Sequence, residues 1–157
     1  MLTVFADGSS KGNPGPAGYA YVIMRDGVLL SAYGTPYASA TNNQAELMAA
    51  ERGLRTAMSL LTPREDILFV SDSLYVLKGM PSLHLGVPAG KPNADLWIAL
   101  RSMLGSLSRK GHKVATYWCK GHNGVPGNEL CDTLAQQAAS TQKRQTAKEL
   151  GKHDDKG

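Results

Sequence analysis

Four acidic residues occupy positions from which they could bind a metal ion together. Asp7 lies at the end of one expected strand and Asp72 at the end of another, residues 67–70. Glu46 falls in the first turns of an expected helix, and Asp132 falls in the last expected helix. If a helical crossover makes the two strands parallel neighbours, the Asp7 and Asp72 carboxylates emerge at the same edge of the sheet. Open α/β sheets place their functional sites at this edge.

Clustered carboxylates point to a particular chemistry. They repel one another and need a cation for stability, and their hard oxygens suit Mg²⁺ or Mn²⁺. Two such ions about 4 Å apart can activate a water and stabilise the leaving oxygen in phosphodiester cleavage. A plainer interpretation remains open at this point, because acids at helix starts and strand ends often act as helix caps, dipole partners or turn residues.

The expected elements are read from apolar periodicity and turn residues. Thr41–Gln44 has the Thr-x-x-Gln form of a capping box, which marks the start of a helix. The expected strands are residues 2–7, 19–24, 28–33, 67–70 and 113–119, and the expected helices are residues 41–61, 73–78, 95–107 and 128–139. Residues 8–18 and 79–92 are expected to be loops. The order predicts an α/β fold with a mixed five-stranded sheet, three antiparallel strands followed by parallel additions, flanked by helices.

The charge distribution fits a polyanionic partner. The formal net charge is +4, and no acid lies between Asp95 and Glu129. That interval carries five bases, Arg101, Arg109, Lys110, Lys113 and Lys120. A basic stretch beside clustered acids suits a polyanion whose cleavage needs a metal, although the same bases could simply solvate a helix and a strand edge.

Length and composition predict one domain. Residues 1–140 form its body, and residues 141–157 form a polar tail that is expected to be disordered. No apolar run approaches the roughly 18 residues of a membrane span, and residues 1–7 do not resemble a signal peptide, so a cytoplasmic location is expected. Cys119 and Cys131 lack any zinc-ligand spacing and are expected to be free thiols.

Five sequence blocks resemble the type 1 ribonuclease H family, also called ribonuclease HI. They are DGSSKGNPGPAGYAYV (7–22), TNNQAELMAA (41–50), SDSLYV (71–76), ADLW (94–97) and YWCKGHNGVPGNELCDTLA (117–135). They occur in the family's order and cover nearly the whole body. The resemblance implies a ribonuclease H catalytic domain over residues 1–140. It also implies an endonuclease that hydrolyses the RNA strand of an RNA–DNA hybrid with two Mg²⁺ ions, or Mn²⁺ as a substitute, leaving 5′-phosphate and 3′-hydroxyl ends.

The resemblance also implies a role for each site residue. Asp7 would bridge both ions, and Asp72 would hold the ion that positions the attacking water. Glu46 would hold the other ion and meet the RNA 2′-hydroxyl, and Asp132 would complete the coordination on the water side. His122 would assist proton transfer or product release.

The substrate itself would be held by polar and glycine-rich positions. The matching residues are Gly8, Ser9, Ser10, Asn13, Thr41, Asn42, Asn43 and Gln44. Thr41 and Asn13 would form part of a pocket for a DNA-strand phosphate. Four aromatic residues, Tyr19, Tyr21, Trp97 and Trp118, are expected in the core rather than against bases. No small-molecule cofactor and no membrane partner are expected, and the expected oligomeric state is a monomer.

Three departures from the family concern the grip on the substrate. Residues 79–92 are short and hold one strong base, Lys91, and no aromatic residue, so the basic protrusion of some members is expected to be missing or reduced. Ser39 stands where some members carry an arginine of the phosphate pocket. Leu74 stands where a polar residue that contacts RNA is often found.

Three alternatives remain at this point. The chain could be a ribonuclease H-like DNA nuclease or resolvase, which would use similar carboxylates. It could also be a non-catalytic module that binds the hybrid. A reverse transcriptase could contain the same domain, although the start at Met1 and the polar tail favour a free-standing protein.

Overall fold

The structure, a computed structural model, describes residues 1–121 and 124–147. Its strands are β1 (Leu2–Ser10), β2 (Gly15–Arg25), β3 (Val28–Ala40), β4 (Ile67–Ser71), β5 (Val114–Trp118) and β6 (Gln145–Thr146). Its helices are α1 (Asn42–Met58), α2 (Leu74–Gly79), the 3-10 helix η1 (Met80–Leu85), α3 (Ala94–Arg109) and α4 (Pro126–Thr141).

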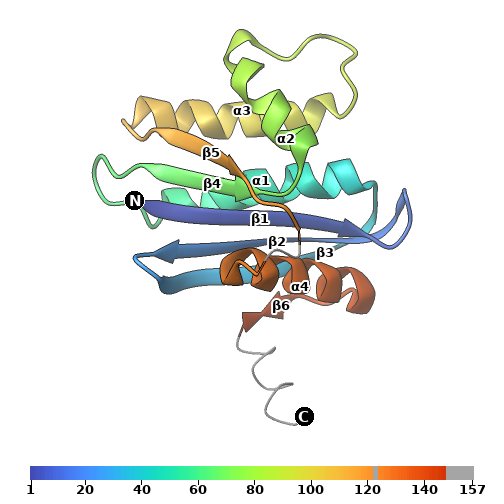
Figure 1. Ribbon diagram of the computed structural model, residues 1–157. Coiled ribbons are helices and arrows are strands. Elements are labelled where there is room, and N and C mark those ends of the chain that lie inside the picture. The colour runs from blue at the N-terminus through green and yellow to red at the C-terminus, as the bar shows by residue number, and fades with distance from the viewer. Residues whose placement is uncertain (122–123, 148–157) are drawn as a thin grey trace.

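All the described strands join one sheet in the order β5-β4-β1-β2-β3-β6 (Figure 1). β1, β2 and β3 are antiparallel neighbours, whereas β4 lies parallel to β1 and β5 parallel to β4. The predicted mixed α/β topology is therefore confirmed. The predicted number of five strands is wrong, because β6 pairs with the outer edge of β3. A two-residue strand shows no alternation of apolar residues, and β6 lies in the segment assigned to the polar tail.

Helices cover both faces of this sheet. Leu2, Val4 and Ala6 of β1 belong to the core beneath α1 and α3, whereas Phe5 belongs to the core beneath α4. This alternation is the one predicted for residues 2–7. In Figure 1, α4 lies in front of β2 and β3, and α1 lies behind the sheet; α4 also contacts β1. Because Asp7 follows Phe5 by two residues, its side chain is directed to the α4 side.

The hairpin strands run further than the sequence predicts. β1 continues through Ser10, and β2 begins at Gly15, both inside the segment expected to be a loop. α4 explains why glycines stand in these strands. A Cβ at Gly18 would lie 2.3 Å from the Ala135 carbonyl oxygen, and one at Gly34 would lie 2.5 Å from the Leu134 carbonyl oxygen. These glycines are therefore packing positions beneath α4 rather than turn residues.

The segment expected to be a loop over residues 79–92 begins with regular structure. Met80–Leu85 forms η1, and residues beyond it are irregular up to α3. Arg101 of α3 donates a hydrogen bond from Nε to the Leu83 carbonyl oxygen at 2.8 Å, which attaches η1 to α3. Met80 and Leu83 are buried beneath this short helix.

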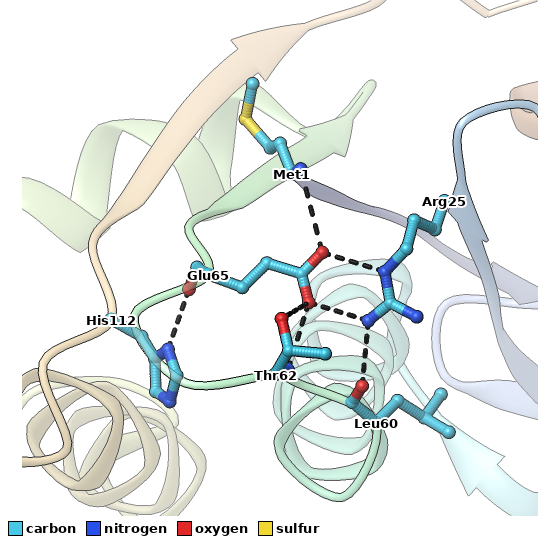
Figure 2. Close-up of polar contacts among 6 residues, drawn as sticks. All are labelled: Met1, Arg25, Leu60, Thr62, Glu65 and His112. Atoms are coloured by element: carbon cyan, nitrogen blue, oxygen red, sulfur yellow. Dashed lines mark hydrogen bonds and ion pairs between the residues drawn. The ribbon is translucent and has the colours of Figure 1, made fainter.

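A polar cluster lies at the opposite edge of the sheet from the carboxyl ends of β1 and β4 (Figure 2). The Glu65 carboxylate accepts two hydrogen bonds from Arg25, at 2.8 Å from Nε and at 2.6 Å from Nη2. It also accepts bonds from the main-chain N–H and hydroxyl of Thr62. His112 Nδ1 donates to the Glu65 carbonyl oxygen at 2.7 Å. The cluster ties the start of β4 to the end of β2.

Candidate active site

Two of the predicted site acids lie at the carboxyl ends of neighbouring parallel strands. Ala6 of β1 pairs with Ser71 of β4, so Asp7 and Asp72 each follow one member of this pair. Asp7 is only 4% exposed. The sequence expectation that a crossover would make these strands parallel neighbours is confirmed.

Glu46 reaches the same edge from α1. The helix begins with the predicted capping box, in which Thr41 Oγ1 accepts from Gln44 N and Gln44 Oε1 accepts from Thr41 N. Glu46 Oε1 accepts a hydrogen bond from Gly8 N at 2.6 Å. A Cβ at Gly8 would lie 2.4 Å from Glu46 N, so only glycine permits this approach of β1 to α1.

Asp7, Glu46 and Asp72 form one acidic cluster. Each offers a carboxylate oxygen, and the three oxygens all lie within 4.8 Å of one another. Burial raises the pKa of Asp7 well above its usual range, and the charges of Glu46 and Asp72 raise it further. Burial also raises the pKa of Glu46. Asp132, which projects from α4, adds to the raised pKa of Asp7 through a hydrogen bond.

The donor set fits a hard divalent cation. Three or more carboxylates that raise one another's pKa would be relieved by a positive charge between them. Oxygen-only ligands of this kind are typical of Mg²⁺ and Mn²⁺ sites rather than of zinc sites, which use histidine and cysteine. Cys131 is fully buried beside the cluster, and its burial and the four acids raise the pKa of its thiol. Cys131 is therefore a neutral packing residue and not a ligand.

Several predicted substrate-binding residues lie beside this cluster and contact one another. Ser10 N donates to Asn42 Oδ1 at 3.2 Å, and Asn42 N donates to Asn13 Oδ1 at 3.0 Å. Ser10 Oγ also donates to the Ala40 carbonyl oxygen at 2.8 Å. The ends of β1 and α1 thus form one polar surface. Asn43 and Asn13 are exposed on it.

Gln44 makes structural hydrogen bonds in addition to the substrate contact predicted for it. Its Oε1 serves the capping box, and its Nε2 donates to Asn93 Oδ1 at 3.2 Å. Asn93 Nδ2 and Trp97 Nε1 both donate to the Tyr75 hydroxyl at 3.1 Å. This chain of contacts joins the start of α1 to α2 and α3. Gln44 therefore caps α1 and links its start to Asn93, and its predicted contact with the substrate stays a prediction.

Sequence reasoning missed Asn93 and Tyr75. An asparagine directly before a helix is normally read as an N-cap, yet Asn93 makes no capping hydrogen bond and adopts a left-handed backbone conformation with φ 60°. That conformation itself is the feature that points to a special role, and it is visible only in three dimensions. Tyr75 lies in the quoted block SDSLYV, but nothing in its spacing indicates two donors to its hydroxyl.

Ser39 lies where some family members carry an arginine of the phosphate pocket. Ser39 is exposed and lines a cavity of about 520 Å³ together with Tyr37, Gln44 and Asn93. Thr41 and Asn13 do not line this cavity. The space exists beside the start of α1, and Ser39 leaves it without an arginine. His122 lies outside the described residues, so its predicted role stays a prediction.

Three of the four aromatic residues expected in the core are there. Tyr19, Tyr21 and Trp97 are 9%, 7% and 1% exposed. The prediction was wrong for Trp118, which is 48% exposed. β5 is an edge strand of the sheet, and its last four residues are all exposed, so the described part of the chain leaves the indole half exposed.

Comparison with known proteins assigns this fold and acidic cluster to a family. The family model described as RNase H matches residues 1–140. The chain belongs to the RNase H family. A ribonuclease H from Chromohalobacter salexigens is 39% identical over 94% of this chain and 88% of its own length.

Solved RNase H structures have the same fold. RNase H1 from Halobacterium salinarum is 28% identical, with a TM-score of 0.67 over 89% of this chain and 98% of its own. LC11-RNase H1, isolated from compost by a metagenomic approach, was solved in complex with an RNA/DNA hybrid. It is 21% identical, with a TM-score of 0.71 over 90% of this chain and 98% of its own, and this likeness concerns the fold alone.

Proposed function

We propose that this protein is an endonuclease that hydrolyses the RNA strand of RNA–DNA hybrids. The observation that carries the proposal is the convergence of Asp7, Glu46 and Asp72 within 4.8 Å at the carboxyl edge of the sheet of an RNase H family member. The relatives named ribonuclease H support the choice of substrate.

The acidic cluster would hold two Mg²⁺ ions. Asp7 would bridge the ions, Asp72 and Asp132 would serve the water side, and Glu46 would serve the other side. The bound ions would supply an activated water and stabilise the leaving oxygen. The main-chain N–H of Gly8 donates to Glu46 Oε1 and so holds this carboxylate at the cluster. His122 would assist proton transfer.

The polar surface beside the cluster would recognise the hybrid. Protein groups can distinguish RNA from DNA by the 2′-hydroxyl and by groove shape. Asn42, Asn43 and Asn13 present amides at the rim of the cluster, and Ser9 and Ser10 lie on the adjoining strand. The hydrogen bonds that join Ser10, Asn42 and Asn13 preorganise these three residues before the substrate arrives.

The further expectations concern the products and the setting of the reaction. Cleavage would leave 5′-phosphate and 3′-hydroxyl ends, and the protein would act as a cytoplasmic monomer. Among the described residues, no helix is long and apolar enough to cross a membrane.

One experiment tests the proposed function. End-labelled RNA is presented with Mg²⁺ as a single strand, in an RNA duplex and in a hybrid with DNA. We expect cleavage only in the hybrid, and loss of cleavage with EDTA or with Asp7→Asn. Equal cutting of single-stranded RNA, or activity that survives Asp7→Asn, would contradict the proposal.

The same experiment separates the alternatives. A DNA nuclease or resolvase would cut a DNA duplex and leave the hybrid intact. A hybrid-binding module would shift the hybrid in a gel in Mg²⁺ without any cleavage. The acidic cluster argues against the binding module, since such a module has no use for carboxylates that repel both one another and the phosphates, whereas a DNA nuclease would use similar carboxylates and is separated only by its substrate.

A further inference from the structure

Trp118 occupies an unusual position at the edge of the acidic cluster. It is the last residue of β5 and pairs in register with Ser71, the last residue of β4. Its side chain is 48% exposed, whereas the other tryptophan, Trp97, is 1% exposed. An exposed indole at the end of an edge strand contributes little to the core, so its contacts need another explanation.

The indole holds the main chain of a site residue. Trp118 Nε1 donates a hydrogen bond to the Asp72 carbonyl oxygen at 3.2 Å. The next residue continues the pattern, because Cys119 N donates to the Ser71 carbonyl oxygen at 2.9 Å. Two consecutive carbonyl groups at the end of β4 are therefore bonded to the end of β5, one by the backbone and one by the tryptophan.

The other side of Asp72 is held by the start of α2. Ser73 N donates to Ser71 Oγ at 3.0 Å, and Ser73 Oγ caps α2 by accepting from Val76 N at 3.2 Å. Asp72 lies between these anchors, one residue beyond the regular ladder of β4. The indole of Trp118 therefore holds the Asp72 peptide from the β5 side, beside the bond between Cys119 N and the Ser71 carbonyl oxygen.

From this geometry we infer that Trp118 is a positioning residue for the metal site. By holding the Asp72 carbonyl, it fixes the backbone from which the Asp72 carboxylate reaches to Asp7 and Glu46. The inference rests on the proposed function, since it assigns Trp118 a role in metal binding by the same cluster. Groups that orient metal ligands from behind commonly change metal affinity by about 10-fold or more when they are lost.

Tryptophan suits this role because its indole is a donor and never an acceptor. It can bond a carbonyl and cannot compete as a ligand for the cation. Trp118→Phe keeps an aromatic ring and removes the donor. Tyr117→Phe is the matched control, because Tyr117 neighbours Trp118 on the same strand, is 60% exposed and also loses one polar group.

The test measures Mn²⁺ binding by calorimetry in the absence of nucleic acid, together with the Mg²⁺ dependence of hybrid cleavage. We expect Trp118→Phe to weaken Mn²⁺ binding about 5-fold to 10-fold and to raise the half-saturating Mg²⁺ concentration similarly. Activity at saturating Mg²⁺ and the melting temperature should change little. Tyr117→Phe should match the unaltered protein in every measurement.

A second measurement does not depend on the catalytic activity of any variant. The unaltered protein has two indole N–H signals in a nitrogen–proton NMR spectrum, and Trp118→Phe identifies one of them. Addition of Mg²⁺ should move the Trp118 signal and leave that of Trp97 nearly unchanged.

The outcomes separate this inference from the proposed function. If the unaltered protein binds Mn²⁺ and Trp118→Phe binds it equally well, with no movement of the Trp118 signal, the inference is wrong and the proposed function stands. If the unaltered protein binds no Mn²⁺ and cleaves no hybrid, the proposed metal site is wrong, and the inference falls with it.

Discussion

At the scale of single residues, Asp7 is the site carboxylate whose charged form is most strongly disfavoured by its surroundings. Its pKa is raised, first by burial and then by Glu46 and Asp72. A carboxyl group with a raised folded-state pKa binds protons more tightly when folded, so it destabilises the metal-free protein as pH rises above the unfolded value of about 3.9. We therefore expect Asp7→Asn to abolish cleavage and to stabilise the metal-free protein at pH 7 by about 1–3 kcal/mol.

Urea unfolding in EDTA at pH 7 and at pH 4 tests this prediction. The stabilisation by Asp7→Asn should be large at pH 7 and small at pH 4, because near pH 4 the unfolded carboxyl also binds a proton and folding no longer requires proton uptake. Mg²⁺ should stabilise the unaltered protein more than the variant. A variant that is less stable than the unaltered protein at pH 7 in EDTA would contradict the argument.

Gly8 allows β1 to pack closely against α1, and its N–H holds the Glu46 carboxylate. A Cβ there would lie 2.4 Å from both Ala45 C and Glu46 N, which are backbone atoms that cannot move alone. We expect Gly8→Ala to cost about 3 kcal/mol or more of stability and to reduce cleavage strongly, because β1 and α1 must separate. Gly27→Ala is the control: Gly27 has φ 78° with nothing within 4 Å, so only a backbone cost of about 1 kcal/mol is expected, with activity retained.

At the scale of elements, Tyr75 joins three helices through one hydroxyl. It accepts from Asn93 and from Trp97, and Asn93 in turn accepts from Gln44 at the start of α1. We expect Tyr75→Phe to destabilise the protein by about 1–3 kcal/mol, since the Trp97 indole N–H would remain buried without its acceptor. Thermal unfolding measures the change, and Tyr117→Phe, at an exposed position, should leave it near zero.

Sequence patterns predicted those features of the helices and strands that depend on residues close together in the sequence. The capping box at Thr41 and the alternation in β1 are both present as expected, because each depends on neighbours within a few residues. The lengths of β1 and β2 were not predictable, because Gly8 and Gly18 read as loop residues until α1 is seen packed against the first and α4 against the second. η1 was likewise missed, because residues 79–92 are rich in glycine and proline.

At the scale of the whole molecule, strand order decides where the acids meet. Asp7, Glu46 and Asp72 could be predicted together because the parallel pairing of β1 and β4 follows from one helical crossover. The exposed position of Trp118 could not, because it depends on β5 being an edge strand whose last four residues are exposed. The carboxyl edge of the sheet thus collects repelling acids, while the opposite edge contains the stabilising cluster around Glu65.

The cluster around Glu65 gives a prediction whose pH dependence is the reverse of that for Asp7. Hydrogen bonds from Arg25 and Thr62 lower the pKa of Glu65 to about 2, and the Arg25 bond is the largest cause (Figure 2). A lowered pKa stabilises the folded state above the unfolded value of about 4.3, and this stabilisation is lost as pH falls toward 2. We expect Glu65→Gln to cost on the order of 1 kcal/mol at pH 7 and nearly nothing at pH 2, without loss of cleavage.

Urea unfolding across this pH range measures the change, with Glu51→Gln as a control of smaller effect, since the Glu51–Arg55 pair is an exposed pair on one helix. A cost that stays constant from pH 7 to pH 2 would show that packing, and not the charge of Glu65, holds this edge together.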